Sequence, residues 1–293
     1  MLNLGRIGVW SGAVGRLPAA AAQEAVAEID DLGYGTLWYP ESVGSKEALS
    51  HGAQLLGWSS RMVVASGIAN LWARDAMAMV NGARALAEAY PGRFLLGVGV
   101  STNVSVPMRG HDYKHPYAAL EAYLNAMDEA DYYGPDPDPP LELILASLGP
   151  RSLRLARERS IGSHTYFVTP EHTSFAREIL GPDRILAVEQ AVLVESDPEV
   201  ARRVARQHAN FYLARSAYRN LLLRLGWNEE QLTNDGSDEL IDAVVAWGDG
   251  DSIRETIQAQ FDAGADHVCL QPLAADPANP AIDQLRALAP ALL

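Results

Sequence analysis

Short runs of apolar residues alternate along this chain with longer amphipathic stretches. Most of the runs are rich in Val, Ile and Leu and are flanked by Gly, Pro or polar residues. Strands that are buried on both faces, as in parallel sheets, have this continuous apolar character. The pattern predicts these strands: Gly5–Trp10, Thr36–Tyr39, Met62–Ser66, Phe94–Val98, Leu141–Ala146, Ser163–Phe167, Ile185–Val194 and His267–Gln271.

The stretches between these runs repeat their apolar residues with the period of a helix. They predict helices over Ala19–Leu32, Lys46–Trp58, Asp75–Tyr90, Pro116–Tyr133, Pro150–Arg159, Thr173–Leu180, Ser252–Ala263 and Ile282–Leu292. Repeated strand–helix units of this kind predict an α/β fold, a (β/α)8 TIM barrel. Because no convincing domain boundary is visible, we expect residues 1–293 to form a single barrel domain.

Residues 197–247 interrupt the alternation after the seventh predicted strand. They carry helical periodicity through Val200, Val204, Tyr212 and Leu222, and they contain no strand candidate. About fifty residues is too long for an ordinary connection. We therefore expect a helical insertion that caps the mouth of the barrel or forms a subunit interface, with a plain scaffold role as the alternative.

Residues at several junctions support these predicted helix and strand boundaries. Gly33 and Gly264 each follow a predicted helix, where a left-handed glycine commonly ends it. The segment Thr169–Glu171 places an N-cap residue, a proline and an acid in the order that favours a helix start.

Composition and charge limit the possible partners. The chain has 293 residues and a net charge of −14, and its only lysines are Lys46 and Lys114. Without a basic stripe, nucleic acid and anionic membranes are not expected partners. The single cysteine, Cys269, lies in an apolar run and excludes an internal disulfide or a cysteine zinc site. The histidines show no metal-ligand spacing, so we expect no metal, and a cytoplasmic location fits these features.

Polar or irregular residues follow several predicted strands at their C-terminal ends. Met62–Ser66 runs into the segment Gly67–Arg74, and Phe94–Val98 leads to the irregular loop Thr102–His115. Glu41 follows the second strand directly. Because catalytic groups of parallel α/β barrels lie at this rim, these segments are the candidate site.

Four segments resemble, in their order and spacing, the luciferase-like flavin and deazaflavin oxidoreductases. Leu32–Glu41 is similar to the family's second-strand signature, and Pro91–Ser101 is similar to its fourth-strand signature. Ala146–Leu153 matches the turn after strand five, and Ala263–His267 matches the approach to strand eight. The resemblance covers nearly the whole chain and implies a TIM barrel of the bacterial luciferase type, with its helical insertion after strand seven.

The segment after the third strand is similar to the branch of that superfamily that uses the deazaflavin coenzyme F420. Those relatives carry a bulge there, with a cis peptide between non-proline residues behind the deazaflavin ring. By position the cis bond is Gly67–Ile68, and the resemblance implies coenzyme contacts from Gly67, Ile68, Ala69 and Asn70. Without the resemblance, Gly67 is simply a tight turn at a strand end.

A second coenzyme-binding element is predicted after the fifth strand. Free backbone amides at a helix N-terminus bind phosphate even in an acidic protein. The turn of small residues that offers them consists of Ala146, Ser147, Leu148 and Gly149. His164 and Tyr166 lie near the same rim and contact either a phosphate or a ring, or are ordinary polar residues of the core.

Glu41 and His111 are the candidate catalytic residues. The Glu41 position is usually acidic in relatives and lies near the deazaflavin, although a helix-entry carboxylate in solvent is the alternative. His111 can move a proton near neutral pH, because the ordinary histidine pKa lies there. Thr102 stands where a sugar-phosphate dehydrogenase relative has an acidic residue, so that activity is not transferred.

The resemblance implies an F420-dependent oxidoreductase that transfers a hydride between C5 of the deazaflavin and a small organic substrate. One alternative is an FMN-dependent two-component monooxygenase that uses reduced flavin and oxygen. A second alternative is a non-catalytic protein that binds a flavin or deazaflavin, because fold alone does not establish function. A homodimer is possible, as in many relatives.

Overall fold

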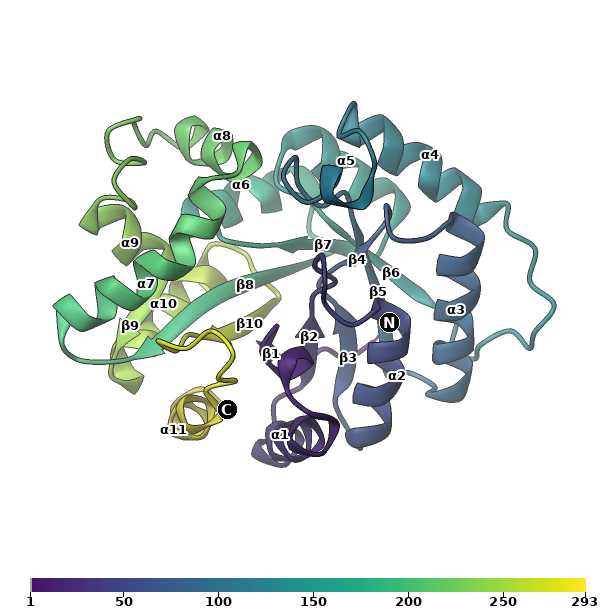
Figure 1. Ribbon diagram of the computed structural model, residues 1–293, viewed down its shortest axis with the longest axis horizontal. Coiled ribbons are helices and arrows are strands. Elements are labelled where there is room, and N and C mark those ends of the chain that lie inside the picture. Colours follow the sequence, from purple (N-terminus) through teal and green to yellow (C-terminus); the bar gives the residue numbers. More distant parts are fainter. Residues whose placement is uncertain (1) are drawn as a thin grey trace.

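Parallel strands of the computed structural model, which describes residues 2–293, close into an eight-stranded barrel (Figure 1). Around the barrel, neighbouring strands are hydrogen-bonded in the order β1, β2, β3, β5, β6, β7, β8 and β10, and β10 pairs with both β8 and β1. The strands are β1 (Ile7–Trp10), β2 (Thr36–Tyr39), β3 (Val63–Ser66), β5 (Phe94–Gly99), β6 (Glu142–Ala146), β7 (Gly162–Thr165), β8 (Ile185–Val194) and β10 (His267–Pro272). The predicted TIM barrel is therefore confirmed.

Helices surround this barrel and bury their apolar faces against it. They are α1 (Ala19–Leu32), α2 (Ala48–Trp58), α3 (Ala76–Ala89), α4 (Pro116–Asp128), α5 (Pro150–Arg159), α6 (Pro170–Leu180), α10 (Gly250–Asp262) and α11 (Ile282–Leu292). Gly33 and Gly264 have φ of 96° and 107°, as expected of left-handed helix ends. Within residues 2–293, no helix combines the length and the apolar character that a membrane span needs.

Two predicted helix boundaries were wrong by three residues or more. α4 ends at Asp128 rather than Tyr133, and beyond this end the carbonyl of Asp131 accepts a hydrogen bond from the Asn81 side chain (2.9 Å). α6 begins at Pro170, three residues earlier than predicted. Thr169 occupies its N-cap position, but its side chain accepts no capping hydrogen bond from the helix.

The segment after β8 contains helices and one strand that the sequence pattern does not reveal. α7 (Pro198–Leu213), α8 (Ser216–Arg224) and α9 (Asp238–Val244) lie together on one side of the barrel (Figure 1). β9 (Val245–Gly248) then pairs with the outer half of β8, from Ala191 to Val194. The prediction of no strand here was wrong, because β8 extends past the barrel wall and leaves an edge that a four-residue segment can extend.

The chain leaves β3 through a bulge that is held by its neighbour β5. The Ser66 hydroxyl donates to the carbonyl of Gly97 (2.9 Å) and accepts from its N–H (2.8 Å). A Cβ at position 97 would lie 1.9 Å from the Ser66 carbonyl oxygen, so only glycine fits. The Gly67–Ile68 peptide is cis, as the resemblance implied, and β4 (Ala69–Asn70) follows it beside β5.

Asp30, at the end of α1, joins this helix to the start of β3. Its buried carboxylate accepts hydrogen bonds from the Ser60 N–H (2.6 Å), the Ser60 hydroxyl (2.7 Å), the Arg61 N–H (3.2 Å) and the Met62 N–H (3.1 Å). Burial alone raises the pKa of this carboxyl, but the hydrogen bonds outweigh burial and hold the pKa below its ordinary value of 3.8. The native state is thus stabilised above pH 3.8.

We predict that Asp30→Ala lowers the free energy of unfolding at pH 7 by about 3 kcal/mol, because several buried N–H groups lose a charged acceptor. The wild-type contribution fades as the pH falls from 3.8 through the lower native pKa, so the gap between the two proteins should narrow there. Urea unfolding across pH measures both effects. Asp31→Ala is the control, since that side chain is exposed; an equal loss in both variants would contradict this role.

Candidate functional site

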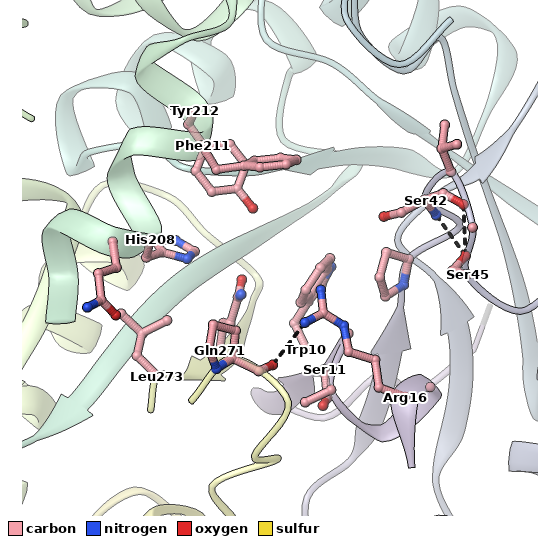
Figure 2. Close-up of a pocket in the computed structure, with 18 of the residues that line it drawn as sticks. Trp10, Ser11, Arg16, Ser42, Ser45, His208, Phe211, Tyr212, Gln271 and Leu273 are labelled. Carbon is pink, nitrogen blue, oxygen red and sulfur yellow. Dashed lines mark hydrogen bonds between the residues drawn. The ribbon is translucent and has the colours of Figure 1, made fainter. Parts of the chain in front are cut away.

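A cavity of about 730 Å³ opens at the C-terminal mouth of the barrel (Figure 2). Its walls come from the ends of β1 and β10, the loops after β2 and β5, and one face of α7. The lining includes Trp10, Arg16, Pro40, Ser42, Lys46, Val104, Met108, His208, Phe211, Tyr212, Arg215, Gln271 and Leu273. The insertion therefore reaches the mouth of the barrel, which is one of the two placements expected for it.

Three predicted coenzyme residues meet directly beside this lining. The Trp10 indole N–H donates to the carbonyl of Gly67 (3.3 Å), and its ring meets that of Tyr166 edge-on at 5.0 Å. A Cβ at position 67 would lie 2.8 Å from Trp10 Nε1 and 3.2 Å from His164 Nε2. The methylene of Gly67 therefore packs between these two rings, where no other residue fits.

His164 is a neutral histidine in this layer. Its Nδ1 lies 3.2 Å from the carbonyl of Ala187, which can only accept, so Nδ1 carries the proton and donates. Its ring stacks on Trp38 at 4.4 Å, and burial lowers the pKa of His164 to about 3. Its Nε2 is buried without a hydrogen-bond partner among residues 2–293 and is an unused acceptor beside Gly67.

A chain of hydroxyl groups links the cavity wall to the barrel. Tyr212 on α7 donates to the hydroxyl of Tyr166 (2.6 Å), which in turn donates to the side-chain oxygen of Gln271. Tyr212 and Gln271 line the cavity, and the sequence analysis missed both. No local signal could have found them, because the three residues are far apart in the chain and meet only in the folded barrel.

Glu189 is a further buried acid that the sequence analysis missed. It lies on β8, is 1% exposed, and accepts from the N–H of Phe167 (3.0 Å). Its other oxygen has no hydrogen-bond partner in the part of the chain that is described. Burial raises the pKa of Glu189 to about 8, so the group is mainly protonated at pH 7. A pair of polar residues, Glu189 and Gln190, within an apolar strand was the available signal.

Glu41 lies next to the cavity but is held by structural contacts. One oxygen accepts from the Ala48 N–H (3.0 Å) and pairs with Arg74, while the other accepts from the Asn70 N–H (2.8 Å). Pro40, its neighbour, lines the cavity, whereas Glu41 does not. The structure thus shows Glu41 joining β2, α2 and β4, and its role as a proton carrier stays a prediction.

The remaining predicted residues after β3, and His111, lie outside the lining of the cavity. Asn70 is buried, and its side-chain oxygen accepts from the N–H of Trp72 (3.0 Å). Ile68 lies close to Gly99, at which a Cβ would approach the Ile68 side chain to 2.8 Å, and Ala69 is fully buried. His111 is exposed, and its ring packs 5.5 Å from that of Trp72.

The predicted phosphate turn forms an open helix start. Gly149 occupies the N-cap position of α5 without any side-chain cap, and Pro150 begins the helix. The hydroxyl of Ser147 donates to the carbonyl of Ser152 (3.1 Å) rather than capping the helix. A Cβ at Gly149 would lie 3.8 Å from Nη1 of Arg224, so a guanidinium lies close to the start of α5. The donor set fits a phosphate group.

Ala146 and Leu148 complete this turn. Ala146 closes β6, paired in register with His164 on β7, and the N–H of Ser147 donates to the His164 carbonyl (3.3 Å). The carbonyl of Leu148 accepts from Nε2 of His172 (2.9 Å). These contacts hold the turn between β6 and α6.

Comparison with known proteins agrees with this architecture. The family model described as luciferase-like monooxygenase matches residues 1–267. No curated protein matches the sequence. Among solved structures, the coenzyme F420-dependent tetrahydromethanopterin reductase from Methanopyrus kandleri is 14% identical, with a TM-score of 0.80, and the match covers 98% of this chain and 99% of that one.

Two further structures are similar over nearly the whole of both chains. An F420-dependent secondary alcohol dehydrogenase, solved with an F420–acetone adduct, is 17% identical with a TM-score of 0.77 and coverages of 98% and 99%. The oxygenating component of 3,6-diketocamphane monooxygenase from Pseudomonas putida, a type II Baeyer–Villiger enzyme in complex with FMN, is 17% identical with a TM-score of 0.72 and coverages of 100% and 99%. At these identities the likeness establishes the fold.

We predict that Glu189→Gln changes how stability depends on pH. Between pH 4.5 and 8 the unfolded chain ionises this carboxyl while the native state keeps it protonated, so the native state loses stability as pH rises. Glutamine keeps an acceptor for Phe167 and removes that loss. Relative to wild type, the variant should therefore gain roughly 3.5 kcal/mol between pH 5 and pH 8. Thermal and urea unfolding at both pH values measure the gain, and exposed Glu178→Gln should show none.

We also predict that Glu41→Gln lowers the free energy of unfolding by about 3 kcal/mol, because it breaks a buried ion pair and places an amide against other donors. Glu47→Gln is the matched control: it removes a second carboxylate from Arg74 (2.7 Å), but that side chain is half exposed and the cost should stay below about 1 kcal/mol. If the two variants were equally stable, Glu41 would not hold this rim together.

Proposed function

Because this chain belongs to the luciferase-like monooxygenase family, a family of oxidoreductases, we propose that it is a coenzyme F420-dependent oxidoreductase acting on a small organic substrate. The observation that carries the proposal is the pairing of an aromatic cavity at the barrel mouth with an open, positively charged helix start at Gly149. A flat tricyclic ring with a phosphate-bearing side chain needs both features.

The cavity supports the ring-binding part of this proposal. Its volume of about 730 Å³ is in the range of pockets that hold cofactor-sized molecules. Trp10, Phe211 and Tyr212 offer flat apolar surface, and Gly67 provides a position without a side chain beside Trp10. We place the ring over this layer, with Ile68, Ala69 and Asn70 at its side.

The start of α5 supports the phosphate-binding part. The amides of its first turn have no side-chain cap, and Arg224 adds a cation within reach. An anion there gains from both the helix dipole and the guanidinium, even though the chain as a whole is strongly negative. We assign the phosphate of the coenzyme to this position.

The bound coenzyme would supply the hydride chemistry, and the chain's own residues supply orientation and proton handling. His164 and Trp38 back the floor of the site as a neutral stack, which keeps charge and water away from that side. His111, on the exposed loop beside Trp72, is the proposed proton carrier, with Glu41 as the second candidate.

The choice of F420 over FMN has two supports. The segment after β3 resembles the F420 branch, and the two F420-dependent relatives superpose somewhat better than the FMN-dependent enzyme. The family name and that FMN enzyme keep an FMN-dependent monooxygenase as the second candidate. Both would use the same cavity, so coenzyme binding decides between them.

We predict micromolar binding of F420, and much weaker binding of FMN, when each is titrated into the protein while the fluorescence of its tryptophans is followed. Arg224→Gln should weaken coenzyme binding about tenfold, because a charge-assisted contact to phosphate is lost. Arg203→Gln, an exposed cation elsewhere on the insertion, should leave binding unchanged. Preference for FMN would move the protein to the monooxygenases, and binding of neither would reject this site.

A further inference from the structure

The charge of the cavity lining is opposite to that of the protein. Three cationic side chains, Arg16, Lys46 and Arg215, line it, and the described lining residues include no Asp or Glu. None of the three cations forms an ion pair within residues 2–293, whereas the partly buried Arg74 and Arg177 each pair with a carboxylate. Arg16 donates only to the carbonyl of Pro277 (3.4 Å). On a chain of net charge −14, this is a local region of positive potential.

Arg215 is the most buried of these cations. It is 6% exposed, its Nη1 donates to the carbonyl of Phe211, and its guanidinium carbon lies 3.2 Å from the centre of the Phe211 ring. Its Nε is buried and has no hydrogen-bond partner in the described chain. A helix C-terminal carbonyl and an aromatic ring offset only part of the cost of burying a full charge.

The groups that face Arg215 from neighbouring elements do not neutralise it. Tyr212 on α7 and Tyr218 on α8 lie near it, and burial raises the pKa of both hydroxyls, so they stay uncharged. Glu189, from β8, is the acid closest to this tyrosine cluster. Because its pKa is raised to about 8, it carries little charge at pH 7. The positive charge of Arg215 therefore remains available to a ligand in the cavity.

The outer rim of the same cavity is apolar. Val104 and Met108, from the loop after β5, and Phe211, from α7, line the cavity and are largely exposed. Figure 2 shows Phe211 and Tyr212 projecting from α7 over the space that is bordered by Trp10 and Gln271. A ligand would thus meet apolar surface at the rim and, next to the Phe211 ring, the largely buried guanidinium of Arg215.

We propose that the substrate is an amphipathic carboxylate, whose apolar body packs against this rim and whose carboxylate is bound by Arg215. This proposal rests on the proposed function, since it names the substrate class of that site. The coenzyme phosphate has a separate position, because Arg224 and Arg215 lie at opposite ends of α8, about 13 Å apart along its axis. Arg16 and Lys46 would attract the anion toward the cavity from the rim.

Binding of octanoate to the purified protein, with and without F420, tests the proposal by isothermal titration calorimetry. Wild type should bind octanoate at least tenfold more tightly than 1-octanol, and its affinity should fall with added salt. Arg215→Gln should weaken octanoate binding about tenfold and leave octanol binding unchanged. Arg215→Lys should retain part of the affinity, and Arg203→Gln, on the outer side of α7, should retain all of it.

Several outcomes would overturn the proposal. Equal affinity of the wild type for octanoate and octanol would overturn it, and so would an octanoate affinity that does not change with added salt. Both results come from the wild type alone and stand even if Arg215→Gln fails to fold. Unchanged octanoate binding in a folded Arg215→Gln variant would also reject it. If that variant lost F420 affinity instead, the cation would belong to the coenzyme. Octanoate binding without any F420 binding would keep the anion site and reject the proposed coenzyme.

Discussion

The arrangement of the active rim depends on one buried carboxylate, that of Glu41. It binds the first N–H of α2, the N–H of Asn70 on β4, and the guanidinium of Arg74 just before α3. These segments follow two different strands, β2 and β3, and Glu41 contacts all of them. Because each contact goes to a charged acceptor in a dry environment, the rim is held more firmly than neutral hydrogen bonds would hold it. The same use of both oxygens explains how Glu41 can lie at the C-terminal rim of the barrel without lining the cavity.

The second constraint on the site is the close approach of neighbouring atoms to the backbone at two glycines. Gly97 allows the carbonyl of Ser66 to approach β5, and Gly67 allows the backbone of the bulge to pack between the rings of Trp10 and His164. A methyl group at either position would overlap atoms of the barrel wall. The floor of the site is therefore fixed by these two glycines, which have no side chain, as much as by its polar contacts. The same close packing makes the wall of the cavity above it rigid.

The sequence predicts the barrel well because its strands are buried on both faces and its helices on one, which gives each element a clear hydrophobic period. Gly33 and Gly264 reveal helix ends for an equally local reason. β9 and the chain from Tyr212 through Tyr166 to Gln271 were not predictable in this way, since they depend on the length by which β8 passes the barrel wall and on how α7 lies across the mouth. The resemblance to a family located the bulge at Gly67, but it gave no sign of Arg215. That residue stands out only in the folded protein, where it is buried without a carboxylate partner.

A guanidinium that is buried without a carboxylate partner is informative, because burying an unpaired charge costs free energy and the chain could avoid that cost in simple ways. A neutral residue at 215 would still allow α7 to end and α8 to begin, and the chain has ample acidic residues with which to pair a structural arginine, as Arg202 and Arg206 pair with Asp238 on the outer surface of the insertion. The acid that lies near Arg215 and its tyrosines, Glu189 on β8, is instead held mainly protonated by burial. The simplest physical account of a cation kept dry and unpaired beside an apolar rim is that the missing negative charge arrives with the ligand.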